Sequence, residues 1–395
     1  MTKCAALLLF TMLVIVSLMD VSKSVRGESK APPIQAVRDA MSQMIDAHEI
    51  PGAVTLVASP EGILHLDATG LANVADKTPM RPDTIFWIAS MTKPITATAI
   101  LMLQDEGKLS VDDLVEKYIP EFANLKTKAG EPAKLTIRHL LTHTSAMGEA
   151  QGAGVKTLAE MMPRYLAKPV NDTPGSKWSY CQSGINTAGR IVEVVSGESL
   201  PDFLEHRLFG PLGMKDTTFY LTEEQLTRYA TSYQKTDKGE LKEADSFGLQ
   251  GKKATNRDRF PAANGGLFST APDYARFCRM ILRGGELDGK RHVKPESVKL
   301  MTTLQSGDLK TGFTPGCGWG LGWCVVREPR GITAMLSPGT FGHGGAFGTQ
   351  AWIDPKGERA YILMVQRTNF PNSDASNVRK AFQEAAAPAT KGQTP

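Results

Sequence analysis

Apolar residues recur with different periods along the two ends of the chain, and each period predicts a type of element. Residues 33–49 carry apolar side chains at helical spacing, and two β-rich runs, 52–59 and 62–70, follow around a turn with the sequence PEG. The far end reverses this order, and its three strand-like runs and one helical run cover 320–326, 349–354, 360–367 and 374–387. We therefore expect an antiparallel sheet flanked by an N-terminal and a C-terminal helix.

The middle of the chain, from about residue 95 to residue 296, is mostly helical in pattern. Its clearest helical runs each have a glycine, a common helix stop, at or next to their last residue, and cover 96–108, 183–197, 200–213 and 271–285. The polar tract 232–263 is weakly periodic, and we expect a long surface loop there. The predicted fold class is α/β of the α+β type. Its parts are a sheet domain over 31–94 and 297–388, a mostly helical inserted domain over 95–296, and a flexible tail over 389–395.

The first 30 residues follow a different pattern. Lys3 precedes an apolar run from Ala5 to Met19, and a small, polar stretch follows it. That is the order of a secretory signal peptide, and the run is shorter than the ~20 residues that a spanning helix needs. We predict a signal peptide over 1–30 and an exported protein, periplasmic or secreted. An uncleaved membrane anchor is the alternative.

Composition and charge describe a folded globular chain without an obvious macromolecular ligand. Of 395 residues, 41% are hydrophobic and 22% charged, which is typical of a packed domain. A net charge of +4, with no block of like charges, argues against nucleic acid as the partner. No cysteine or histidine cluster has zinc spacing, so no metal site is expected. The cysteines beyond the signal peptide fit buried thiols as well as disulfides, and they are Cys181, Cys278, Cys317 and Cys324.

The stretch FWIASMTKPITATAI, residues 86–100, contains the pattern Ser-x-x-Lys at Ser90 and Lys93. Residues three apart share a helix face, so Lys93 can reach back to Ser90. A serine hydroxyl needs a base to become a nucleophile, and lysine serves as one when burial lowers its pKa. The apolar residues on both sides predict such burial. Because the pattern alone is weak, a helix-capping serine beside a surface lysine remains the alternative.

Two further segments supply groups that this chemistry needs. In WSYCQSG, Tyr180 stands at the start of a helix; beside a lysine ammonium it can be phenolate-like, share the base role and later protonate the leaving group. In FGHGGAFG, His343, Gly344 and Gly345 precede a strand, where glycines allow close backbone approach and an N–H can help to form an oxyanion hole. The sequence lacks G-x-S-x-G and H-E-x-x-H, so α/β-hydrolase and zinc-peptidase sites are not supported.

Together with LTIRHLLTHTS, GPLGMKDTTF, NGGLFSTAPDYARF and GWGLGW, these motifs resemble the serine β-lactamase and penicillin-binding protein superfamily. The resemblance covers nearly the whole chain after residue 30 and is specific for the class C β-lactamase-like branch, which includes D,D-peptidases, D-aminopeptidases and carboxylesterases. By position it implies that Ser90 is the acylated nucleophile, Lys93 its base and Tyr180 the second acid/base. It implies an oxyanion hole made by the backbone N–H groups of Ser90 and Ala346, with no metal or cofactor. The histidines of RHLLTHTS, His139 and His143, are expected to be structural.

Two residues depart from the family pattern. Gln182 stands where the Y-x-N motif has asparagine, and it keeps the amide with one more methylene. His343 replaces the lysine of K-T-G, and a histidine is largely neutral near pH 7. With Gly344 and Gly345, these two residues are expected to bind substrate. The family lysine helps to hold the carboxylate of β-lactams and D-Ala-D-Ala peptides, and a neutral imidazole would bind an anion less well by ~1–3 kcal/mol.

The expected function is therefore that of a serine hydrolase that forms a covalent acyl-enzyme on Ser90 and acts on small esters or amides. One alternative is a β-lactamase, D,D-peptidase or D-aminopeptidase for peptidoglycan-type substrates. An alternative of another class is a penicillin-binding or cell-wall-sensing module that is acylated without turnover. The expected partner is a small-molecule ester, amide or peptide, and the oligomeric state is not predicted.

Overall fold

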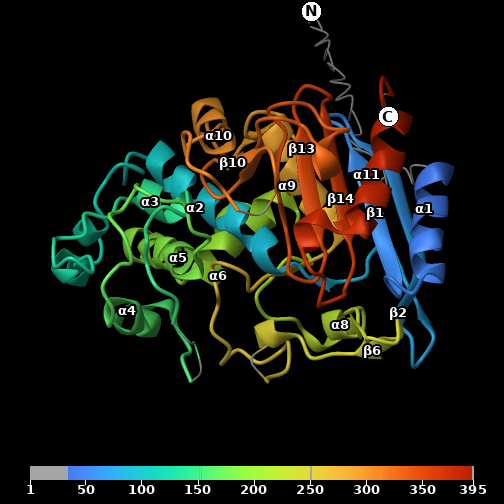
Figure 1. Cartoon of the computed structure of the whole chain (residues 1–395), viewed down its shortest axis with the longest axis horizontal. Coiled ribbons are helices and arrows are strands. Elements are labelled where there is room, and N and C mark those ends of the chain that lie inside the picture. The colour runs from blue at the N-terminus through green and yellow to red at the C-terminus, as the bar shows by residue number, and fades with distance from the viewer. Residues whose placement is uncertain (1–33, 151, 153, 250, 313, 394–395) are drawn as a thin grey trace, which may run out of the picture. The chain divides into compact units, whose positions relative to one another are not determined.

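A single antiparallel sheet of eight strands organises the structure, a computed structural model that describes residues 34–150, 152, 154–249, 251–312 and 314–393 (Figure 1). The strand order is β10-β11-β12-β13-β14-β1-β2-β3. The strands are β1 (Gly52–Ala58), β2 (Ile63–Asn73), β3 (Thr78–Pro79), β10 (Cys317–Trp319), β11 (Cys324–Val326), β12 (Phe341–Gly344), β13 (Gln350–Asp354) and β14 (Arg359–Met364). Strands β1 and β14, from opposite ends of the chain, pair with each other, with Val54 opposite Met364. The predicted fold class is confirmed. The predicted signal peptide lies outside the described residues.

Helices cover both faces of this sheet because residues along each strand alternate between two apolar clusters. In β1, Leu56 belongs to the cluster that includes Phe277 of α9 (Ala271–Leu282), and Val57 belongs to the cluster that includes Phe382 of α11 (Asn377–Ala389). The predicted terminal helices, α1 (Gln35–Asp46) and α11 (Asn377–Ala389), are confirmed and lie together (Figure 1).

The remaining helices come from the middle of the chain, as the sequence pattern predicts. They are α2 (Thr92–Asp105), α3 (Ile137–Leu141), α4 (Leu158–Leu166), α5 (Gln182–Ser196), α6 (Leu200–Leu204), α7 (Gly210–Leu212), α8 (Glu223–Leu226) and α10 (Pro295–Thr302). Helix α2 packs against α5, and its residues from Thr92 to Leu103 are all buried. The division of the chain into a sheet domain and a helical domain stays a prediction. No helix of the described part is both long and apolar enough to cross a membrane.

The expected strand over 320–326 is only partly right, because a tight turn divides it. Strands β10 and β11 form a hairpin in which Trp319 pairs with Cys324. Gly322 lies at the turn with a φ of 75°, a left-handed conformation that glycine adopts without strain. At Gly320, a Cβ atom would lie 2.4 Å from the carbonyl oxygen of Met301. The glycines that looked like part of one strand therefore form the turn.

The expected surface loop over 232–263 is wrong in part. It contains a hairpin, β5 (Tyr233–Lys235) with β6 (Leu241–Glu243), and its later half turns inward. Arg259 and Phe260 are buried, and the Arg259 guanidinium donates to backbone carbonyls, including that of Ala254 at 3.1 Å. Backbone acceptors allow this charged residue to be buried, which its polar sequence context does not indicate. The other short strand pairs are β4 (Phe86–Trp87) with β7 (Phe268–Ser269) and β8 (Glu286–Leu287) with β9 (Lys290–Arg291).

Candidate active site

Ser90 and Lys93 lie where β4 leads into α2. Ser90 is part of a 3-10 turn (Ala89–Met91), and Lys93 is the second residue of α2. The N-cap residue of α2 is Met91, without a side-chain capping bond, and Lys93 is fully buried. The reading of this pair as a helix cap and a surface lysine is therefore wrong.

The backbone just before Ser90 has an unusual conformation. Ala89 has a φ of 45°, in the left-handed region that residues with a side chain seldom adopt and that costs roughly 1–3 kcal/mol. The hydroxyl of Thr92 donates to the Ala89 carbonyl oxygen at 2.7 Å and so holds the turn. Such strain is often found at functional residues, and here it presents the partly exposed Ser90 to the cavity beside it.

The Lys93 ammonium is held between two oxygens. Its Nζ donates to Ser90 Oγ at 3.0 Å and to the backbone oxygen of Asn264 at 2.7 Å. Burial lowers the pKa of Lys93 from 10.5 to about 7, and the carboxylates of Glu149 and Asp374 oppose this shift. Near pH 7 a substantial fraction of Lys93 is thus neutral and able to take the Ser90 proton.

Tyr180 completes a compact group with these two residues. The Lys93 Nζ lies 4.7 Å from the centroid of the Tyr180 ring, and the Tyr180 hydroxyl hydrogen-bonds to Ser90. Burial raises the pKa of Tyr180 well above its usual value. Tyr180 is therefore a neutral phenol, and the expected phenolate character is wrong. A neutral hydroxyl in this place is suited to giving a proton to a leaving group.

The rings of His143 and Trp319 pack against the Tyr180 ring. Their ring centroids lie 4.5 and 5.9 Å from that of Tyr180, and His143 Nδ1 accepts a hydrogen bond from the Cys181 backbone at 3.1 Å. His139 does not contact this ring in the described structure. Its Nδ1 accepts a hydrogen bond from the Thr136 N–H at the N-terminus of α3 and so helps to cap that helix. These contacts fit the expected structural role of both histidines, which stays a prediction, and they place His143 against Tyr180 in the site.

His343 lies on β12, and its imidazole is protonated on Nδ1. Nδ1 donates to the Gly344 carbonyl oxygen at 2.7 Å, so Nε2 is an acceptor, 3.5 Å from the Tyr180 hydroxyl. Burial and the nearby Lys93 lower the pKa of His343 to about 3. The expectation of a neutral imidazole at this position is confirmed.

The glycines after His343 allow the end of β12 to approach its neighbours closely. A Cβ atom on Gly345 would lie 2.6 Å from the Ile88 carbonyl oxygen, and one on Gly344 would lie 1.8 Å from a carboxylate oxygen of Asp374. Ala346 follows and lines the same cavity as Ser90, and no hydrogen bond from its backbone N–H occurs among the described residues. The oxyanion hole of Ser90 and Ala346 stays a prediction that this arrangement permits.

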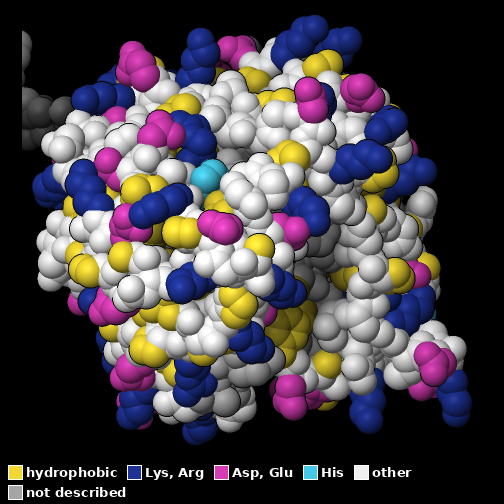
Figure 2. Space-filling model, turned by 60° about the vertical axis from the view of Figure 1, so that its left-hand side comes forward, with side chains coloured by type: hydrophobic (Ala, Val, Ile, Leu, Met, Phe, Trp, Pro, Cys, Tyr) yellow, Lys and Arg dark blue, Asp and Glu magenta, His cyan; other side chains and the backbone are white. Residues whose placement is uncertain are grey.

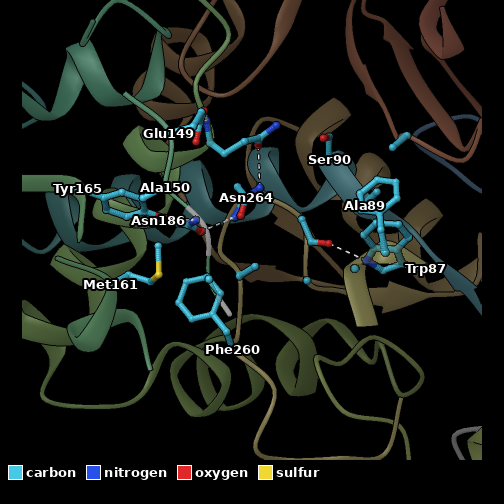
Figure 3. A pocket seen from close by; sticks show the side chains of 18 residues that line it. Trp87, Ala89, Ser90, Glu149, Ala150, Met161, Tyr165, Asn186, Phe260 and Asn264 are labelled. Carbon is cyan, nitrogen blue, oxygen red and sulfur yellow. Dashed lines mark hydrogen bonds between the residues drawn. The ribbon is translucent and has the colours of Figure 1, made fainter. Parts of the chain in front are cut away.

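The cavity beside Ser90 has a volume of about 380 Å³ and is lined by residues from several distant parts of the chain (Figure 3). Large apolar side chains form much of its wall, and they are Trp87, Met161, Tyr165, Phe247 and Phe260. Phe247 and Phe260 belong to the tract expected to be a surface loop, and Phe247 contacts Trp87 edge-to-face at 5.0 Å between centroids. Sequence patterns gave no signal for this use of the tract.

A polar wall faces the aromatic residues. Gln182 lines the cavity as expected, and its amide oxygen accepts a hydrogen bond from Asn264 at 2.7 Å. Asn186 in turn accepts the Asn264 backbone N–H at 3.1 Å. Glu149 accepts the backbone N–H groups of Gln182 and Ser183 at the start of α5. The NGG motif contains Asn264 and could have identified it, whereas Glu149 had no such signal.

Asp374 is a second carboxylate that sequence reasoning missed. It lies in a 3-10 turn (Ser373–Ala375) beside β12, and Gln350 donates to it at 3.3 Å. Burial raises its pKa.

The four cysteines of the described part are free thiols, and no group of three potential metal ligands occurs there. Charges of both signs intermix on the face shown in Figure 2, without a large patch of one sign.

Comparisons with known proteins identify a family and several similar proteins. The model of the β-lactamase family matches residues 37–386. Esterase EstB of Burkholderia gladioli is 30% identical over 380 residues, which cover 88% of this chain and 93% of that protein. Penicillin-binding protein 4 of Amycolatopsis lactamdurans is 33% identical over 311 residues, with coverages of 77% and 76%. The solved structure of EstCE1, a hydrolase with promiscuous acyltransferase activity, has a TM-score of 0.77 and 26% identity, covering 89% of this chain and 97% of that one.

Proposed function

The chain belongs to the β-lactamase family of serine hydrolases, and from that premise we propose that it hydrolyses small carboxylic esters through an acyl-enzyme on Ser90. In the first half-reaction, neutral Lys93 takes the Ser90 proton while Oγ attacks the ester carbonyl carbon. The resulting oxyanion accepts hydrogen bonds from the N–H groups of Ser90 and Ala346. Tyr180 donates its proton to the departing alkoxide and regains one from the Lys93 ammonium.

The second half-reaction reverses these proton movements. A water molecule attacks the acyl carbon, and its proton passes to the Tyr180 and Lys93 pair. When the second tetrahedral intermediate collapses, the carboxylic acid leaves and Ser90 Oγ takes a proton back. Lys93 ends neutral, as it began. His343 acts only as a hydrogen-bond acceptor for Tyr180 in this scheme.

One observation carries the preference for esters over β-lactams and D-Ala-D-Ala peptides: among the described residues, the sheet edge of the site offers no cation for a substrate carboxylate. His343, with a pKa of about 3, is neutral at physiological pH. The charged residue that lines the cavity is Glu149, which repels anions. Because β-lactams and peptidoglycan peptides carry a carboxylate, Glu149 opposes their binding and neutral His343 provides no charge to attract them. The similarity to EstB supports the same substrate class.

The second candidate is a β-lactamase, D,D-peptidase or D-aminopeptidase, and the 33% identity to a penicillin-binding protein favours it. A module that is acylated without turnover is the third. The three candidates differ in rates with p-nitrophenyl esters of two to eight carbons, nitrocefin and D-Ala-D-Ala peptides. We expect turnover of the esters to be the fastest. Rapid acylation followed by a stopped reaction would support the third candidate.

The controls are variants of the site. Ser90→Ala should lose at least roughly 10³-fold in kcat/KM on esters, whereas Ser42→Ala on α1, away from the cavity, should not. His343→Lys should raise the ratio of nitrocefin to ester hydrolysis. Full ester hydrolysis by Ser90→Ala would refute the proposed mechanism, and a strong preference of the wild type for nitrocefin would refute the proposed substrate class.

Export is part of the proposal, and it rests on the pattern of residues 1–30. Expression of the full chain in a bacterial host with cell fractionation tests it. We expect activity outside the cytoplasm and a mature N-terminus, found by mass spectrometry, near residue 30. Activity confined to the cytoplasm with an intact N-terminus would contradict export.

A further inference from the structure

Glu149 is the one charged residue among the described residues that line the cavity beside Ser90. In the view of Figure 3, Glu149 and Ser90 lie on either side of Asn264, and all three residues line this cavity. A substrate acylating Ser90 and extending into the cavity therefore approaches a carboxylate. Glu149 takes no part in the proposed acyl transfer itself.

The backbone holds the Glu149 carboxylate in place. It accepts the N–H groups of Gln182 at 2.5 Å and Ser183 at 3.3 Å, the first two residues of α5. The positive end of the helix dipole favours an anion at this position. Glu149 thus presents a fixed negative charge to the cavity, although its side chain is exposed. A fixed charge is better suited to selecting a ligand than a mobile one.

No cation of the protein neutralises this charge in the described structure. Glu149 takes part in none of the salt bridges there, whereas several other exposed carboxylates do, among them Asp83, Asp112 and Asp258. Lys93 is close enough to act on its pKa, but the Lys93 Nζ donates to Ser90 and to the Asn264 carbonyl instead. Desolvation, the largest effect, raises the pKa of Glu149. An approaching cation would relieve this cost.

We propose that Glu149 determines substrate specificity by binding an ammonium group of the substrate, so that the preferred esters are those with a cationic amine. This inference rests on the proposed esterase function and names its substrate class. Tyr165 and Phe260 line the same cavity and offer aromatic surface to the ammonium and to the methylene groups that carry it. The Glu149 carboxylate retains lone pairs for an ammonium N–H beside its two backbone bonds.

Three p-nitrophenyl esters of nearly equal length test the proposal: 6-aminohexanoate, heptanoate and mono-adipate, which end in an ammonium, a methyl and a carboxylate group. At pH 8, wild-type kcat/KM should be highest for the cation and lowest for the anion, after correction for uncatalysed hydrolysis. In Glu149→Gln the ratio of cation to neutral ester should fall about tenfold, the low end for a charge-assisted hydrogen bond. Glu149→Lys should reverse the preference towards the adipate.

Glu160→Gln is the matched control. Glu160 is an exposed carboxylate in the first turn of α4 and does not line the cavity, so its variant should keep the wild-type ratio. Raising sodium chloride from 0.05 to 0.5 M should lower the ratio in the wild type and not in Glu149→Gln, because salt screens an exposed charge pair. If Glu149 served only to cap α5, Glu149→Gln would lower thermal stability but would change neither the ratio of cationic to neutral ester hydrolysis nor its dependence on salt.

The outcomes separate this inference from the proposed function. If wild type and Glu149→Gln share one ratio while Ser90→Ala abolishes hydrolysis of all three esters, the specificity role is overturned and the esterase proposal stands. If Ser90→Ala hydrolyses them as well as wild type does, the esterase proposal itself fails. A lower melting temperature of Glu149→Gln with an unchanged ratio shows a helix cap alone and overturns the inference.

Discussion

Lys93 should make ester hydrolysis depend on pH in a defined direction. The pKa of its ammonium falls from 10.5 to about 7 because the side chain is fully buried. This fall corresponds to about 5 kcal/mol against the charged form. Near pH 7 about half of Lys93 is then neutral, against roughly 0.03% of a lysine in water, so burial supplies about a thousandfold more base.

The pH profile of kcat/KM for a neutral p-nitrophenyl ester measures this directly. Between pH 5.5 and 9 it should rise with a slope of one and level off above an apparent pKa near 7. Lys93→Arg should lose both the activity and the rise, because a guanidinium cannot deprotonate near neutral pH. Lys108→Met, which changes a lysine just beyond α2 outside the cavity, is the control and should keep the profile. A flat profile with Ser90-dependent hydrolysis would refute Lys93 as the base.

The same pKa shift also predicts how stability depends on pH. The folded pKa, about 7, lies below the unfolded value of 10.5, so between these values the unfolded state binds more protons and stability rises with pH. The destabilisation caused by burying the Lys93 ammonium is at its full size below pH 7 and disappears as the pH approaches 10.5. The Lys93→Met variant lacks this destabilisation. The amount by which its unfolding free energy exceeds that of the wild type should therefore be about 2–3 kcal/mol larger at pH 6 than at pH 9. Equal gains in urea unfolding at both pH values would contradict the lowered pKa.

Three further substitutions test separate parts of the site. Tyr180→Phe should lower kcat for esters by ~10²–10⁴-fold with little change in urea midpoint, because it removes the proton donor; unchanged kcat would exclude that role. Gly344→Ala should cost about 1–3 kcal/mol in urea unfolding, because its Cβ would meet Asp374 at 1.8 Å; Gly148→Ala, with open space around its Cβ, is the control. Phe247→Ala should raise KM several-fold for octanoate relative to acetate esters, since Phe247 is 63% exposed and lines the cavity; an unchanged ratio would show that Phe247 does not contact the acyl chain.

Local patterns predicted the elements well in two cases: α1, which has one buried face, and β1, a short apolar run that is buried along its whole length. The helical spacing of residues 33–49 gave α1, and the β-rich run 52–59 gave β1, within a few residues of their observed ends. The hairpin of β10 and β11 was missed because its glycines resemble a strand interior in sequence. The tract 232–263 was misjudged because its polar residues hide the burial of Phe260, which depends on distant segments.

The sequence by itself determined the chemistry at the centre of the site. Ser90 and Lys93 are three residues apart, so backbone geometry brings their side chains together wherever this turn forms. Only the tertiary structure decided what surrounds them: Glu149 and Asn264 lie far from Ser90 in sequence, and packing brings them to the same cavity. It also decided the charge states of Lys93 and His343, because a pKa depends on burial and on neighbours that no local pattern contains.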